Sequence, residues 1–151
     1  MRNTAPLGSL RLASEYLAAA TSVLPPPTTD LEAFRLKISF PAYFLVGHSI
    51  ELSLKAFLLG RGATKDELRS RKFGHKLDAL LSEARRRRLG SEVKLPQDET
   101  RAIVELNNCY SVKELEYAEV GYRRMPSYAL VHRVAGRLCH GLQAYVRRVG
   151  A

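Results

Sequence analysis

The chain has 151 residues, 46% of them apolar, so it is long enough to bury the core of one domain and too apolar for wholesale disorder. Its 24 basic and 15 acidic residues give a net charge of +9, which is consistent with either a polyanionic partner such as RNA or DNA or an inert basic surface. No uncharged apolar run reaches about 18 residues, and Arg11 and Glu15 interrupt the N-terminal apolar stretch, so we expect no membrane span and no secretory signal.

The first half of the chain has helical periodicity. We expect a first helix over 8–24, ended by three consecutive prolines that cannot continue it. A second, long helix is expected over 30–60. Thr29 and Glu32 have the spacing of a capping box at its start, and glycines follow its end. Pro41 lies inside this run, so it either kinks one long helix or opens a new helix after a short break.

The second half continues the same pattern. Thr64 and Glu67 repeat the capping spacing and predict a short helical turn. Further helices are expected over 75–89, 96–109 and 127–149, with Pro96 in the first turn of its helix. The tyrosine-containing segment 110–126 has no clean period, and we expect a long ordered loop there.

No strand pattern or internal repeat is visible, so we predict an all-α protein. The expected architecture is an up-and-down bundle of about four to five helices forming a single domain over 1–151. Cys109 and Cys139 are too few for a disulfide scaffold and have no metal-ligand spacing. We therefore expect free thiols in a reducing, cytoplasmic location.

One stretch of the long helix, GHSIELSLKAFLLGRG, carries ionisable side chains in an otherwise apolar sequence. His48, Glu51 and Lys55 fall within about 60° of one another on a helix, forming a narrow polar strip. Two interpretations are open. The strip is a structural arrangement, with Glu51 and Lys55 as a favourable ion pair, or it faces a cleft or a partner, where His48 beside a carboxylate could act as an acid or base. A metal site is not expected, because His-x-x-Glu occurs once without a second set of acidic ligands.

The segments GHSIELSLKAFLL and KFGHKLDALLSEA resemble the HEPN superfamily. Members often carry a helix that reads roughly G-H-x-x-E-L-x-L-K, followed by a G-H-x-L motif at the start of the next helix. Here the first motif begins at Gly47 and the second at Gly74. The resemblance extends from about residue 9 to 148. It implies a helical bundle, commonly a homodimer, and in many members a metal-independent ribonuclease of toxin–antitoxin or phage-defence systems. Other members bind nucleic acids or nucleotides without catalysis, or serve as assembly modules.

Active members carry an arginine, usually then a polar residue, and a histidine after a short spacing. No standard copy is present: Arg69 precedes His75 by five intervening residues, but Ser70 stands where Asn, Asp or His is usual. The segment between Arg133 and His140 begins with an apolar residue. The resemblance therefore implies Arg69 and His75 as catalytic residues, with Glu51 orienting one of them.

These observations leave three hypotheses. The first is an RNA-directed protein that either cleaves RNA or has lost catalysis and only binds it. It would act without a cofactor, and if it is a toxin it would have an antitoxin partner. Its predicted nucleic-acid-binding residues are Arg69, Arg71, Lys72, Arg85, Arg86, Arg87 and Arg88. The four consecutive arginines also have a structural interpretation as cations at the negative end of a helix dipole. The second hypothesis is a non-catalytic dimerisation or adaptor module. The third is a small-molecule pocket lined by His48, Glu51, Lys55 and the loop tyrosines.

Overall fold

The computed structural model describes residues 5–35, 38–110 and 125–150, and within these ranges the chain is all-helical, with no strands. This confirms the predicted all-α class. The longer helices are α1 (Ala5–Val23), α3 (Phe40–Gly60), α6 (Gln97–Tyr110) and α8 (Tyr128–Gly141). The shorter ones are α2 (Asp30–Arg35), α4 (Lys65–Arg69), α5 (Leu77–Arg86), the 3-10 turn η1 (Leu89–Ser91) and α9 (Gln143–Gly150).

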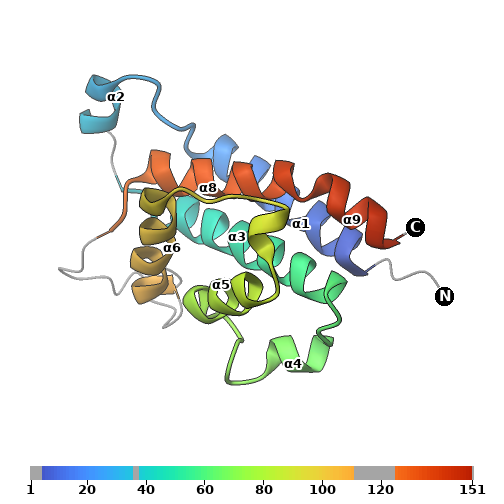
Figure 1. Ribbon diagram of the computed structural model, residues 1–151. Coiled ribbons are helices and arrows are strands. Elements are labelled where there is room, and N and C mark those ends of the chain that lie inside the picture. Colours follow the sequence, from blue (N-terminus) through green and yellow to red (C-terminus); the bar gives the residue numbers. More distant parts are fainter. Residues whose placement is uncertain (1–4, 36–37, 111–124, 151) are drawn as a thin grey trace.

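Helix α3 lies at the centre of the fold (Figure 1). It packs against α1 on one side and against α5, α6, α8 and α9 on the others. More than half of its residues are buried, including Val46, Ile50, Leu54 and Phe57. Among the described residues it is the one helix long and apolar enough to cross a membrane, but 67% of that apolar window is buried inside the protein. A helix that is apolar almost all round and surrounded by others is typical of a protein core.

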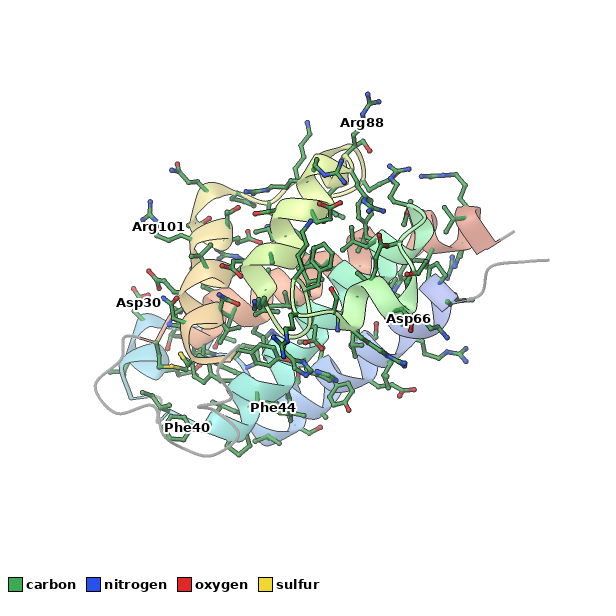
Figure 2. The ribbon with its side chains drawn as sticks, turned by 90° about the horizontal axis from the view of Figure 1, so that it is seen from below. Asp30, Phe40, Phe44, Asp66, Arg88 and Arg101 are labelled. Atoms are coloured by element: carbon green, nitrogen blue, oxygen red, sulfur yellow. The ribbon has the colours of Figure 1, made fainter. Side chains whose placement is uncertain are left out.

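Helices α1 and α3 form the most extensive helix pair (Figures 1 and 2). Ala13 on α1 is fully buried, and its small side chain suits the close approach of α1 to Ser49 of α3. Two serine hydroxyls join the pair. Ser49 donates to the carbonyl of Ala13 at 2.8 Å, and Ser9 donates to the carbonyl of Leu52 at 3.0 Å. These bonds fix the register of α1 along α3.

The segment 30–60 forms two helices rather than one long, kinked helix. Ser39 caps the start of α3 by accepting a hydrogen bond from the backbone N–H of Ala42, and Pro41 lies in the first turn. Proline is tolerated there because first-turn N–H groups have no partner within the helix. Pro41 therefore opens α3, the second of the two alternatives. At the other end, Gly62 adopts a φ of +95° just after α3 stops, as the glycine pattern predicted.

Two other predicted helices have different limits. The segment 75–89 forms α5 and then η1, because Arg88 takes the left-handed conformation with φ of 70° between them. The segment 127–149 is divided into α8 and α9 around Leu142. The division coincides with close packing, since a Cβ added at Gly141 would lie 2.7 Å from the Val93 side chain. The segment predicted as a loop over 110–126 lies mostly outside the described residues.

Gly47 on α3 gives a test of this packing. An added Cβ would lie 2.8 Å from the ring of Tyr110, whereas one added at Gly136 on α8 would meet nothing within 4 Å. We expect Gly47→Ala to lower the free energy of unfolding by roughly 1–3 kcal/mol through overpacking. The matched variant Gly136→Ala should raise it by up to about 1 kcal/mol, because alanine is the better helix former. Urea denaturation measures both, and equal stabilisation by the two substitutions would contradict this packing.

Candidate functional site

The carboxylate of Glu51 is buried in the core helix, and it is the centre of the candidate site. Its side chain is 2% exposed. Three side chains approach its two oxygens: His75 Nδ1 lies 2.6 Å from Oε1, His48 Nδ1 lies 3.2 Å from Oε2, and Lys55 Nζ lies 3.8 Å from Oε2. A buried charge is costly unless it is paired, and this carboxylate has partners on both oxygens. The polar strip predicted from the sequence therefore converges on one group.

Helical periodicity and tertiary packing assemble the cluster together. His48, Glu51 and Lys55 share one face of α3 because they are three and four residues apart. His75 comes from the segment just before α5. The position of that segment is fixed by Asn107 of α6, whose side-chain oxygen accepts a hydrogen bond from the first backbone N–H of α5, that of Leu77, at 2.8 Å. The side chain of Asn107 thus takes the place of a helix cap.

The hydrogen bond to Glu51 determines which nitrogen of His75 is available. A carboxylate accepts hydrogen bonds, so the proton of a neutral ring lies on Nδ1, and Nε2 carries the free lone pair. The His75 side chain is 52% exposed, whereas its partner is buried. The pair therefore has the arrangement of a general base: a buried acid sets the tautomer and orientation of an imidazole whose other nitrogen is available to a reacting group.

The pKa of Glu51 lies below its ordinary value of 4.5. Burial is the largest single influence and raises the pKa, but hydrogen bonds from His48 and His75 and the charge of Lys55 together outweigh it. Glu51 is thus a carboxylate at neutral pH. Because its pKa is lower in the folded than in the unfolded chain, its contribution to stability is present above about pH 4.5 and is lost as the pH falls through the folded-state value.

Aromatic rings enclose His48. Tyr16 of α1 meets it edge-on with ring centroids 4.5 Å apart, and Phe44 stacks on it at 5.9 Å. Its Nδ1 also lies 3.0 Å from the hydroxyl of Tyr110, which comes from the end of α6. The ring of Tyr110 in turn lies against His75, with centroids 6.4 Å apart. The side chain of His48 is 21% exposed and that of His75 is 52% exposed, so His75 is the more open of the two to a substrate.

Arg69, the other predicted catalytic residue, does not join this cluster. No contact of Arg69 with His75 or Glu51 is found in the described part of the chain. Arg69 instead lines a groove between α1, α3 and α4 together with Lys55 and Lys65. Lys55 therefore contributes to both sites: its ammonium group approaches Glu51, and its side chain lines the groove.

The other predicted nucleic-acid-binding residues lie in two places. Arg71 and Lys72 are exposed in the segment between α4 and His75, and Lys72 lies over the ring of Phe73 at 5.2 Å. The arginine run ends α5, as its dipole interpretation predicted. Arg86 and Arg87 both bind Glu83, and hydrogen bonds from these two arginines are the main reason that the pKa of Glu83 is lowered to about 2.

The remaining two arginines of the run differ from this pair. Arg85 donates to the hydroxyl of Thr100 at 2.6 Å. Arg88 points away from the body of the protein (Figure 2) and forms no ion pair with a described residue. Two of the four arginines therefore share one carboxylate, that of Glu83, which balances one of their two charges. Within the described ranges, no group of three or more His, Cys, Asp or Glu side chains could hold a metal ion.

Sequence reasoning did not find Asn107 or Tyr16 as members of the site, and it included Tyr110 only as one of the loop tyrosines of the small-molecule hypothesis. All three residues lie on other helices than Glu51, so no local spacing in the sequence connects them to the polar strip. Asn107 had one signal: it is a polar residue among the apolar positions of α6, and it is 9% exposed. Buried polar groups require partners, and here the partner is the start of α5.

Comparisons with protein-family models, with curated proteins and with solved structures give no significant match to this chain.

The first test of this site replaces the buried carboxylate. We expect Glu51→Gln to lower the free energy of unfolding by roughly 1–3 kcal/mol at pH 7, because the amide keeps the shape but leaves the neighbouring donors without a charged acceptor. Glu15→Gln on the exposed face of α1 is the matched control and should change stability by less than about 0.5 kcal/mol. Chemical denaturation gives both values. If Glu51→Gln leaves the free energy of unfolding unchanged, the electrostatic account of the cluster is wrong.

The pH dependence of the same variant tests the sign of the pKa shift. The stability difference between the wild type and Glu51→Gln should be largest above pH 4.5 and should shrink at lower pH, where the wild-type carboxylate takes up its proton. Thermal unfolding between about pH 3 and 7 measures the difference. A difference that grows on acidification would mean that the folded-state pKa is raised instead.

Proposed function

We propose that this chain is a HEPN-like, RNA-directed protein in which His75 acts as a general base that Glu51 holds in position. The observation that carries the proposal is the 2.6 Å hydrogen bond between an exposed imidazole and a buried carboxylate. The net charge of +9 and the HEPN-like motifs around Gly47 and Gly74 support an RNA substrate.

The chemistry that fits this site is cleavage of RNA by its own 2′-hydroxyl. Nε2 of His75 takes the proton of the 2′-hydroxyl, and the 2′-oxygen attacks the adjacent phosphorus. The bond from phosphorus to the 5′-oxygen breaks, and that oxygen takes up a proton from solvent, leaving a 2′,3′-cyclic phosphate and a 5′-hydroxyl. A cation is needed to stabilise the crowded phosphate, and Lys55 and Arg69 are the candidates. No metal ion takes part in these steps.

The family resemblance also suggests that two copies act together as a homodimer, with each protomer contributing a His75. As an intracellular toxin, such a protein would have an antitoxin partner. The second candidate function is a non-catalytic dimerisation or adaptor module. It is favoured by the absence of contact between Arg69 and His75, because the two residues do not form one unit within the described protomer.

The decisive assay is cleavage of end-labelled RNA. We expect His75→Ala to reduce cleavage by about 100-fold or more, the contribution typical of a general base. His140→Ala, at an exposed position near the end of α8, is the matched control and should cleave as the wild type does. A substrate with a single 2′-deoxynucleotide at the cleavage site should resist both the wild type and His140→Ala, because it lacks the attacking hydroxyl. Equal cleavage by His75→Ala and the wild type would overturn the assigned role.

RNA binding is tested separately by its salt dependence. The affinity should fall steeply as salt rises, because each cation that contacts a phosphate releases counterions. Replacing both Arg71 and Arg88 with Gln should reduce the slope of log K against log salt by about two, one for each lost contact. Arg147→Gln on α9 is the control and should leave the slope unchanged. A wild-type slope near zero in filter binding would exclude RNA as the partner and leave the adaptor function.

A further inference from the structure

The groove between α1, α3 and α4 has aliphatic walls and a third cation, Lys65, that the RNA chemistry proposed at His75 does not use. It has a volume of about 460 Å³, within the range of about 300–1,000 Å³ that is usual for small-molecule sites. Its lining residues are Ala5, Gly8, Ser9, Leu12, Leu52, Lys55, Leu59, Lys65, Leu68 and Arg69. They comprise aliphatic walls, three cations and no acid.

Two of the three lining cations have no acidic partner among the described residues. Lys65 and Arg69 belong to α4, and neither forms an ion pair with a described residue. Lys55 is 16% exposed, and Glu51 is its one described acidic partner, at 3.8 Å. Of the two acids of α4, Glu67 is engaged elsewhere, since its carboxylate accepts a hydrogen bond from the backbone N–H of Thr64. The positive charge of Lys65 and Arg69 is therefore available to an anion.

The walls favour an aliphatic body over a nucleobase. Among the described residues that line the groove there is no aromatic ring on which a base could stack. The one hydroxyl, that of Ser9, already donates its hydrogen to the carbonyl of Leu52. What the groove offers instead is leucine surface. Leu12 in particular is 42% exposed, although it lies on a helix that packs closely against the core.

Gly8 keeps part of the groove open. It is exposed on α1, and a Cβ added there would meet nothing within 4 Å. Glycine inside a helix costs about 1 kcal/mol relative to alanine, so helix stability does not explain its presence. Gly8 is one of the lining residues, so an added side chain at this position starts from open space beside the leucines.

We propose that this groove binds an amphipathic anion, with a carboxylate or phosphate head held by Lys55, Lys65 and Arg69 and an aliphatic chain lying on the leucines. The pairing follows from charge complementarity at one edge and apolar burial along the walls. The groove shares Lys55 and Arg69 with the RNA chemistry proposed at His75, but binding of such an anion does not require that chemistry. The two are adjacent through Lys55, so a bound anion would compete with Glu51 for that ammonium group.

The test is calorimetric titration of the full chain with decanoate and with decyl phosphate, each kept below its micelle concentration. We expect one ligand per chain, and the tighter of the two probes tells a carboxylate from a phosphate head. Decanol, which has no charge, and inorganic phosphate, which has no chain, should each bind at least about tenfold more weakly, because each makes only half of the contacts. Decanol binding as tightly as decanoate, or inorganic phosphate binding as tightly as decyl phosphate, would overturn the proposal.

Two variants locate the site. Gly8→Leu should fill the groove and weaken decanoate binding by about tenfold or more, while circular dichroism and the thermal midpoint show an intact helical fold. The matched variant Gly136→Leu places the same side chain at an open position on α8 and should bind as the wild type does. Lys65→Gln should weaken binding by about threefold to tenfold through the loss of one charge. Unchanged binding by a folded Gly8→Leu protein would place the ligand elsewhere and contradict the proposal.

Discussion

The burial of one carboxylate in the central helix is the constraint on which the rest of the structure depends. Glu51 lies on a helix that is surrounded by five others, at 1% residue exposure, so its charge has to be balanced within the fold. Its partners come from its own helix and from the segment before α5. Pairing the charge of Glu51 therefore requires the segment before α5 to lie beside α3. A second buried polar group, Asn107 of α6, binds the first backbone N–H of α5 and holds the same segment.

This arrangement separates two properties that a catalytic imidazole needs. Orientation comes from the buried carboxylate, which binds Nδ1, and access comes from the exposure of the imidazole, whose side chain is 52% exposed. His48 has the same carboxylate as a partner but is enclosed by Tyr16, Phe44 and Tyr110. Two histidines beside one acid thus differ in what they can do, and the difference arises from packing, not from their spacing in the sequence.

How much of this could be predicted from the sequence depends on whether a feature is local. The helical class, the ending of α3 at its glycines and the capping box at Thr64 follow from periodicity and backbone chemistry within a few residues. The polar strip on α3 follows from the same geometry. The break before Pro41 was an open alternative, because whether proline kinks a helix or opens one depends on a cap such as Ser39.

Features that depend on distant contacts were not predicted. The residue pattern near Leu142 does not predict the division between α8 and α9, which coincides with the approach of Val93 to Gly141. The placement of Tyr110 against Gly47, and of Arg69 in a groove with Lys55, likewise depends on how helices pack. The short spacing between Arg69 and His75 suggested a shared site, but Arg69 forms no described ion pair with Glu51 and lines the groove beside Lys55 instead.

The central claim is that Glu51 holds the imidazole of His75 with its proton on Nδ1 and its Nε2 free. Nitrogen-detected NMR of the histidine rings in alkaline solution, where imidazoles are neutral, measures this directly. We predict that His75 has a protonated Nδ1 and an unprotonated Nε2, and that Glu51→Gln shifts it towards the mixture shown by the exposed His140. A wild-type His75 with its proton on Nε2, or with the same mixture as His140, would contradict the account.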